Sequence, residues 1–295
     1  MKVRDILNDG IKRLEAAGID NATLDARELL KQAYGMDTAE LLMNLDRPLC
    51  PGAAGGTEPV EITECPGDCG AKLTFASSIN MRARRVPLQH ILGYAYFMGL
   101  EFKVNEHVLI PRQDTEILVE TVLTHEQDKT ARLIDMCTGS GCIAVALKAI
   151  GGYENVAAAD IDKAALNVAL RNASVNKADI RLFESDLFEN ISESFDVIVS
   201  NPPYIETAVI ETLEPEVRDH DPRKALDGGA CGLDFYKRII NEAAGTVKAA
   251  AYSHEAEKKH ADGALRSGGR LYFEIGSEQA EAVTGLMKEA GFTDI

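Results

Sequence analysis

Hydrophobic residues recur at helical spacing near the start of the chain. Over residues 2–18 the apolar positions lie three and four residues apart, and Gly18 ends this first predicted helix. These positions are Val3, Ile6, Leu7, Ile11 and Leu14. A second helix is predicted from Thr23 to Tyr34. A third begins at Asp37, where Glu40 stands three residues on, as in a capping box.

The periodicity is lost over residues 48–70, which are rich in proline, glycine and cysteine and which predict a long loop or insertion. A fourth helix is predicted through residues 77–85. Alternating segments then flank Met98 and Gly99, a pattern that indicates a β-hairpin. We therefore expect a helical domain over residues 1–86, a hairpin linker over 87–110 and a larger domain over 111–295.

The pattern of the larger domain is a repeat of short apolar strands and helices. Strands are predicted at 132–137, 155–160, 179–185, 195–200 and 268–276, and helices at 141–150, 163–176 and 277–291. This alternation is typical of a parallel sheet covered by helices on both faces. The predicted fold class is α/β, with a doubly wound sheet.

The composition of the chain limits the kinds of partner that the protein can bind. The chain has 295 residues and a formal charge of −16, which disfavours a long contact with a nucleic-acid backbone. No apolar run is long enough for a membrane span, and the first residues lack a signal-peptide core. We expect a cytoplasmic protein with reduced thiols. Cys50, Cys65 and Cys69 are an alternative zinc set, but they lack a fourth ligand, and no metal is predicted.

Two glycines follow the first strand of the larger domain. Gly139 and Gly141 allow a tight turn and close approach of a ligand to the backbone, just before a predicted helix. A dinucleotide-binding loop would also have glycine at position 144, where this chain has Ala144. The pattern therefore fits either nucleotide-type binding or a tight structural turn.

Carboxylates end three of the predicted strands, at Asp135, Asp160 and Asp186. Asp160 can accept hydrogen bonds from ribose hydroxyls, or it can cap the next helix, a role that is also open to Asp162. A row of carboxylates would repel a pyrophosphate but suits a ligand with hydroxyls, an ammonium and an amine. S-adenosylmethionine (SAM) fits this description.

The fourth of these strands runs into the sequence SNPPY. Each proline restricts the residue before it, so Asn201 and Pro202 are held in an extended backbone. The side-chain oxygen of Asn201 and the carbonyl of Pro202 can then accept both N–H groups of one planar amine or amide, and Tyr204 can stack on the substrate. The alternative is a plain turn with Tyr204 in the core.

These motifs resemble those of one family. NPPY is shared by amino methyltransferases of adenine, guanine and glutamine. The segments PLQHILGYAYFMGLEF, VLIPRQDTEILVE, DMCTGSGCIAVAL and EVRDHDPRKALDGGACGLDFYKRII together resemble the HemK/PrmC family of peptide chain release factor glutamine N5-methyltransferases. The resemblance covers nearly the whole chain. It implies a SAM-dependent enzyme whose helical domain and hairpin help to grip a release factor, and we expect it to act as a monomer.

The resemblance also implies roles for individual residues. The substrate glutamine would be held by Asn201, Pro202, Pro203 and Tyr204, with Asn201, Pro202 and Tyr204 catalytic. The cofactor would be bound by Asp135, Cys137, Thr138, Gly139, Ser140, Gly141, Asp160, Asp186, Leu187 and Asn201. Thr115 and Glu116 would close over the cofactor. Arg218, Asp219 and Asp227 either shape the substrate entrance or are solvated surface charges.

The chain departs from the family pattern at several places. Gln113 stands where proline is usual, and Cys137 where glycine is usual, so Cys137 must adopt a compatible turn and is interpreted as a packing residue. Residues 51–70 and 249–264 are atypical. The fold usually continues with two more strands beyond Gly291, so we expect an incomplete sheet edge.

Two other functions compete with glutamine methylation. A methyltransferase of nucleic-acid bases would use the same NPPY pocket, but the acidic net charge opposes it. A noncatalytic interaction protein could keep the fold, but an intact NPPY motif argues against this alternative.

Overall fold

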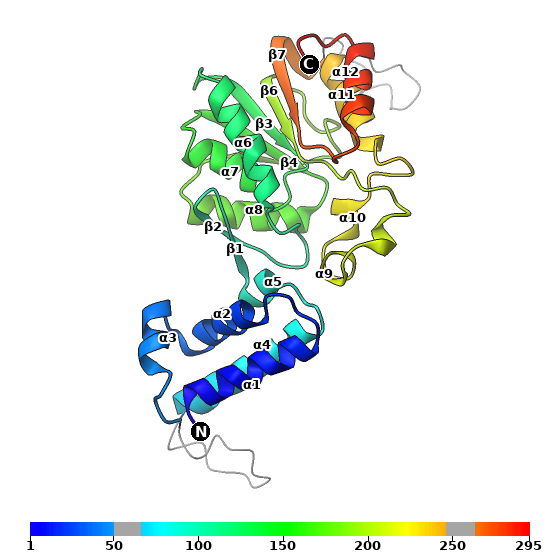
Figure 1. The fold of residues 1–295 in the computed structure, drawn as a ribbon. Coiled ribbons are helices and arrows are strands. Elements are labelled where there is room, and N and C mark those ends of the chain that lie inside the picture. Colours follow the sequence, from blue (N-terminus) through cyan, green and yellow to red (C-terminus); the bar gives the residue numbers. More distant parts are fainter. Residues whose placement is uncertain (50–65, 246–262) are drawn as a thin grey trace. The chain divides into compact units, whose positions relative to one another are not determined.

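The computed structural model describes residues 1–49, 66–245 and 263–295. These residues form two compact units, Met1–Gly93 and Tyr94–Ile295 (Figure 1). The strands of the predicted hairpin therefore belong to the second unit. Most of the atypical segments 51–70 and 249–264, together with Cys50 and Cys65, lie outside the described residues.

The first unit consists of helices. They are α1 (Val3–Ala16), α2 (Ala22–Tyr34), α3 (Thr38–Asn44), α4 (Pro66–Ala83) and α5 (Leu88–Leu92). The fourth helix begins at Pro66, so the prediction of a loop up to residue 70 was wrong there. The short α5 was not predicted at all, because it occupies five residues between a proline and Gly93.

Helix capping and apolar packing stabilise the first unit. Asp37 accepts a hydrogen bond from the backbone N–H of Glu40, and the Glu40 carboxylate accepts one from that of Asp37, which confirms the predicted capping box. Gly35 ends α2 in the left-handed conformation. The apolar stripes of α1 and α2 pack on α4, and a buried ion pair of 2.7 Å joins Asp25 to Arg82.

The second unit begins with the predicted hairpin. Strand β1 (Tyr94–Phe97) pairs antiparallel with β2 (Leu100–Lys103). Met98 and Gly99 join them with φ values of 52° and 75°, the positive pair typical of a tight two-residue turn. Glu116 accepts a hydrogen bond from the Met98 N–H. The hairpin is thereby anchored to the following helix, α6 (Gln113–His125).

A five-stranded parallel sheet forms the centre of this unit, in the order β5-β4-β3-β6-β7. The strands are β3 (Arg132–Met136), β4 (Asn155–Asp160), β5 (Arg181–Glu184), β6 (Phe195–Ser200) and β7 (Leu265–Phe273). Successive residues face opposite layers: Leu133 packs with α6 and α7 (Cys142–Ala149), while Ile134 packs with α11 (Asp234–Ala244). The expected doubly wound α/β fold is confirmed.

The remaining elements connect or flank this sheet. They are α8 (Lys163–Val175), the short helix η2 (Ile210–Thr212), α9 (Pro215–Arg218), α10 (Arg223–Leu226) and α12 (Ala280–Glu289). Among the described strands β7 lies at one edge, and the expectation that the fold normally adds two strands there stays a prediction. No helix of the described ranges is long and apolar enough to cross a membrane.

The strand order reverses between β3 and β6. The chain moves outward from β3 through β4 to β5, and then returns to the other side of β3 to form β6. In open parallel sheets, such a reversal opens a crevice at the carboxyl ends of the two central strands, where ligands bind. This topology positions the loops after β3 and β6 side by side.

Candidate active site

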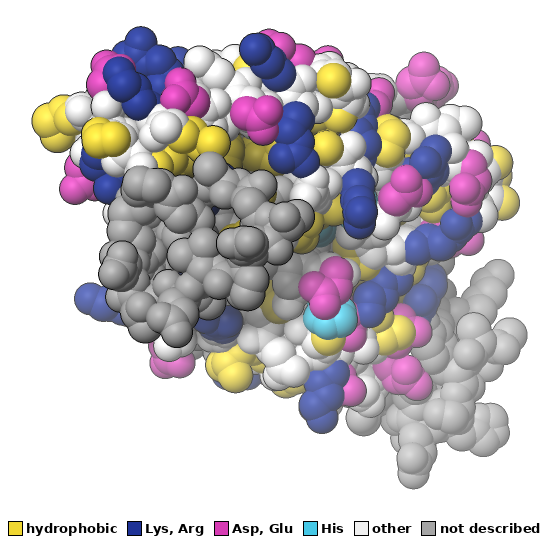
Figure 2. Space-filling model, turned by 90° about the horizontal axis from the view of Figure 1, so that it is seen from below, with side chains coloured by type: hydrophobic (Ala, Val, Ile, Leu, Met, Phe, Trp, Pro, Cys, Tyr) yellow, Lys and Arg dark blue, Asp and Glu magenta, His cyan; other side chains and the backbone are white. Residues whose placement is uncertain are grey.

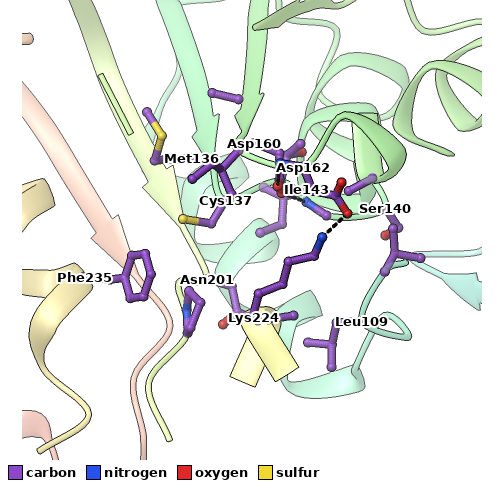
Figure 3. Close-up of a pocket in the computed structure, with 18 of the residues that line it drawn as sticks. Leu109, Met136, Cys137, Ser140, Ile143, Asp160, Asp162, Asn201, Lys224 and Phe235 are labelled. Atoms are coloured by element: carbon purple, nitrogen blue, oxygen red, sulfur yellow. Dashed lines mark hydrogen bonds and ion pairs between the residues drawn. The ribbon is translucent and has the colours of Figure 1, made fainter. Parts of the chain in front are cut away.

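A cavity of about 420 Å³ lies at the carboxyl ends of the central strands (Figure 3). Residues 137–140, 160–162 and 185–187 line it from the loops after β3, β4 and β5. Asn201 enters from the loop after β6, and Lys224 and Phe235 enter from α10 and α11. This volume is in the range of small-molecule sites.

The cavity brings together most of the predicted site residues. Those that line it are Cys137, Thr138, Gly139, Ser140, Asp160, Asp186, Leu187, Asn201 and Pro203. Four others do not line it: Asp135, Gly141, Pro202 and Tyr204. Thr115 lines the cavity as expected, whereas Glu116 binds the hairpin turn instead, so its predicted closure over the cofactor is corrected.

The loop after β3 depends on left-handed backbone conformations. Cys137, Gly139 and Gly141 have φ values of 62°, 53° and 80°. A Cβ atom on Gly141 would also lie 3.0 Å from the Cβ of Ala169 in α8. Larger residues are therefore excluded at this position both by the positive φ and by the lack of space. Cys137 does adopt the turn that glycine would favour. Burial raises the pKa of its thiol, which fits packing better than nucleophilic chemistry.

Asp135 holds the loop after β3 in place through hydrogen bonds. It is fully buried, and its Oδ2 accepts hydrogen bonds from the Thr138 hydroxyl at 2.5 Å and the Ala144 N–H at 3.2 Å. Burial raises its pKa to about 7. The prediction that three carboxylates face the ligand is therefore wrong for Asp135, which shapes the loop and the start of α7.

Asp160 faces the cavity and also holds the glycine loop. One oxygen, Oδ2, accepts from the Gly139 N–H at 2.9 Å, and Oδ1 accepts from the Asp162 N–H at 2.9 Å. Burial raises its pKa. Asp162, and not Asp160, caps α8 by accepting from the Ala164 N–H. Asp160 is thus left at the cavity wall, where a hydroxylated ligand can reach it.

Asp186 and Leu187 line the cavity from the loop after β5. Asp186 pairs with Arg238 of α11 at 2.8 Å, so much of its charge is balanced. Leu187 is buried with a φ of 50°. Arg238 was not predicted, because nothing near the strand ends indicates which cation of a later helix will reach this loop.

Two ion pairs join the segment after NPPY to the rest of the cavity wall. Arg112, which lines the cavity, pairs with the buried Asp221 at 2.7 Å. Lys224 of α10 pairs with Asp162 (Figure 3). Asp227 also lines the cavity, and its role at the substrate entrance stays a prediction. Arg218 and Asp219 are exposed and pair with each other, as in the interpretation of solvated surface charge.

The NPPY loop meets Thr115 and two side chains that the sequence did not indicate, Glu274 and Gln279. Asn201 Nδ2 donates to the hydroxyl of Thr115 at 3.2 Å. The Tyr204 hydroxyl donates to Glu274 at 3.4 Å, and the backbone oxygen of Tyr204 accepts from Gln279 at 3.0 Å. Burial raises the pKa of Tyr204. The loop is therefore held by α6 at Asn201 and by the region after β7 at Tyr204.

Comparison with known proteins identifies the family. Two family models match: the "Methyltransferase small domain" at residues 112–215 and the "PrmC N-terminal domain" at residues 5–55. A release factor glutamine methyltransferase of Geobacter sulfurreducens is 40% identical over 99% of this chain and 90% of its own length. The chain belongs to the release factor glutamine methyltransferase family. Proteins of the same name from Cereibacter sphaeroides and Moorella thermoacetica are each 37% identical, covering 100% and 99% of this chain and 93% and 91% of their own lengths.

Membership of the release factor glutamine methyltransferase family makes this a SAM-dependent methyltransferase, and the cavity fits the cofactor. Asp160 offers a carboxylate to hydroxyl groups, and the glycine loop offers close backbone approach. The three cations that line the cavity are Arg112, Lys224 and Arg238, and each pairs with an acidic side chain. This balance suits SAM better than a phosphate-bearing nucleotide. The described residues contain no group of three or more acidic, histidine or cysteine side chains placed to hold a metal.

Proposed function

We propose that this protein transfers a methyl group from SAM to the side-chain amide nitrogen, N5, of a glutamine in peptide chain release factors. The observation that carries the proposal is the position of Asn201. It stands on a proline-stiffened loop at the wall of the cofactor cavity, and its nitrogen is bound by Thr115. The side-chain oxygen of Asn201 is therefore available to accept a hydrogen bond from the substrate. The relatives named above support the choice of a release factor glutamine as the substrate.

The chemistry requires acceptors more than a strong base. An amide nitrogen is a poor nucleophile because its lone pair is delocalised into the carbonyl. Asn201 Oδ1 and the Pro202 carbonyl would accept its two N–H groups, favour a pyramidal nitrogen and stabilise the positive charge that develops on it. SAM supplies the electrophilic methyl group. The new N–C bond forms as the S–C bond breaks, and the surplus proton on nitrogen then leaves to water.

The cofactor roles follow from the cavity. We propose that Asp160 binds the ribose hydroxyls and that the Asp186–Leu187 segment lies beside the adenine. The loop 137–141 would wrap around the amino acid part, with Asp135 supporting it from inside the fold. Tyr204, which is half-buried and does not line the cofactor cavity, would contact the glutamine from the other side of the loop.

The helical first unit and the β1–β2 hairpin are proposed to contact the release factor. Exposed apolar side chains on α3, Leu42 and Met43, and on the hairpin, Tyr96, are suited to a protein partner. We also propose that the protein resides in the cytoplasm and works as a monomer; sedimentation of the purified chain would check the oligomeric state.

A nucleic-acid base is the competing substrate for this pocket. On the face drawn in Figure 2, lysine and arginine side chains are interspersed with acidic ones among the described residues. A phosphate backbone is bound by concentrated positive charge, and the net charge of this chain is −16. Both observations support a protein substrate.

The test is transfer of a labelled methyl group from SAM to a purified release factor, to the same factor with its glutamine changed to alanine, and to DNA and RNA. We expect label on the intact factor alone. Label on nucleic acid would contradict the proposal. No label together with no SAM binding in calorimetry would indicate a noncatalytic protein.

Replacing Asn201 tests whether methyl transfer depends on the NPPY loop. Asn201→Ala should lower kcat by about 100- to 1,000-fold, because one acceptor of the reacting amide is removed. Its affinity for SAM should fall far less than kcat, because Asn201 is one of several residues that line the cofactor cavity. Asn155→Ala is the matched control, since Asn155 stands at the opposite end of the sheet and donates to the Thr130 carbonyl.

A further inference from the structure

Glu274 lies beside Asn201 at the carboxyl edge of the sheet. Ser200 and Phe273 are paired in the register of β6 and β7, and the Glu274 N–H donates to the Ser200 carbonyl at 3.1 Å. The two strands thus deliver Glu274 and Asn201 to neighbouring positions. The role of Glu274 is not explained by the cofactor cavity, which it does not line.

The carboxylate of Glu274 is close to both polar side chains of the NPPY loop. Its Oε1 accepts from the Tyr204 hydroxyl, while its Oε2 is buried without a well-formed hydrogen bond. Burial raises the pKa of Glu274, and the nearby Thr115 hydroxyl, Tyr204 hydroxyl and Asn201 amide act in the opposite direction. Oε2 is therefore an acceptor in the immediate surroundings of Thr115 and Asn201.

Thr115 is the second member of this group. It comes from the first turn of α6, is 2% exposed and accepts the hydrogen bond from Asn201 Nδ2. Among the described residues, the Oδ1 atom of Asn201 has no donor. The nitrogen of the Asn201 amide is thus bound within the protein, and its oxygen is unoccupied.

The chemistry of these neighbours favours one orientation of the amide. A carboxylate can only accept, so it attracts the NH₂ group of an asparagine and repels its oxygen. A hydroxyl that already faces a carboxylate donates its proton there and keeps its lone pairs for the asparagine. Both effects direct Nδ2 toward Thr115 and Glu274.

We propose that Glu274 and Thr115 are positioning residues that fix the side-chain amide of Asn201 with its oxygen, and not its nitrogen, available to the substrate N–H. This inference rests on the proposed function, because the orientation matters only for a substrate that donates. In the reversed orientation two donors would face each other, and the substrate amide would lose its acceptor.

The first test is a kinetic comparison of Thr115→Val, Thr115→Ser and Glu274→Gln. Valine has no acceptor, and glutamine can present its own NH₂ to Asn201 and favour the reversed orientation. Each of these two variants should lower kcat by about 10- to 100-fold, as expected for a misplaced catalytic contact. KM for the release factor and affinity for SAM should change less than about threefold. Thr115→Ser keeps the hydroxyl and should restore most of kcat.

Matched controls separate positioning from general effects. Thr121→Val changes the same residue type on the same helix, where the hydroxyl only bonds the Ile117 carbonyl. Glu278→Gln removes a charge from an exposed position four residues beyond Glu274. Both controls should keep kcat within about twofold. Unchanged kcat in Thr115→Val and Glu274→Gln would overturn the proposal.

The double variant tests whether the two residues act through one amide. If they do, the kcat of the double variant Thr115→Val/Glu274→Gln should lie no more than about threefold below that of the slower single variant. The reason is that the effects of residues acting on a shared group are not additive. Losses that multiply would show two separate roles and overturn the proposal.

A spectroscopic measurement separates this inference from the function on which it rests. In protein labelled with ¹⁵N-asparagine, the side-chain NH₂ signal that disappears in Asn201→Ala belongs to Asn201. It should shift in Thr115→Val and Glu274→Gln and stay in place in the two controls. If the wild type methylates no release factor but the signal shifts, only the proposed function fails. If the signal does not respond, the positioning role is overturned.

Discussion

The loops after β3 and β6 are neighbours, because Met136 pairs with Ser200 at the ends of the two strands. They are built in opposite ways. The cofactor loop after β3 uses three residues of positive φ, whereas the NPPY loop after β6 contains two prolines, which restrict the backbone. One loop bends tightly around a ligand, and the other holds acceptors at fixed positions.

Each loop also has a carboxylate behind it, that of the fully buried Asp135 or that of the half-buried Glu274, and the two carboxylates differ in what they hold. Asp135 binds the Thr138 hydroxyl and the Ala144 N–H, and so fixes the cofactor loop and the start of α7. Glu274 faces the side chains of Asn201 and Tyr204. In both, one carboxylate oxygen is buried without a well-formed hydrogen bond to any described residue. A strand end therefore becomes a site when polar groups behind it fix the loop that follows.

The largest effect is expected at Gly141. Gly141→Ala should lower the free energy of unfolding by about 3 to 4 kcal/mol, because the new Cβ is both in the left-handed region and too close to Ala169. Gly139→Ala is the matched variant, since its φ is also positive but nothing lies within 4 Å of the new Cβ. It should lose only about 1 to 2 kcal/mol. Denaturant titration measures both, and equal losses would refute the packing argument.

A smaller, pH-dependent effect is expected at Asp135. Its folded-state pKa of about 7 lies above the unfolded value, so its protonated form is favoured by folding and stability falls as the pH rises toward and through 7. Relative to Asp135→Asn, the wild type should lose roughly 2 to 3 kcal/mol of unfolding free energy between pH 5 and pH 8. A difference that does not vary with pH would show that Asp135 is ionised throughout.

The smallest effect is expected at Cys137. Cys137→Gly relieves the positive φ of 62° but removes the packing of the side chain against the core, so we expect a change below about 1 kcal/mol. Lys177→Gly is the comparison, because Lys177 has a φ of 54° at an exposed position and little packing to lose. It should gain about 1 kcal/mol. A larger gain for Cys137→Gly would mean that the thiol contributes nothing to packing.

The elements that were predicted well have strong local signals. β4 and β6 begin and end at the predicted residues, because each is an apolar run between polar residues. Helices α6 and α11 were missed, although both are longer than ten residues. Gln113 begins α6 where the family usually has proline, and both residues suit a first helical position, so the departure changes little.

The sequence by itself determined which residues stand at the strand ends. In a parallel sheet the residue that follows a buried strand must lie at the carboxyl edge, so Asp160 and Asn201 were placed at the cavity by local pattern alone. Prolines and glycines likewise act within a residue or two. Chain connectivity and short-range sterics are sufficient for this part of the site.

Only the tertiary structure decided which side chains meet these residues. Thr115 precedes Asn201 by 86 positions, and Glu274 reaches it through the register of β6 and β7. Burial then decided that Asp135 supports a loop instead of facing a ligand. Contacts between distant segments and the loss of solvent around a charge are properties of the packed molecule, and no local pattern of residues contains them.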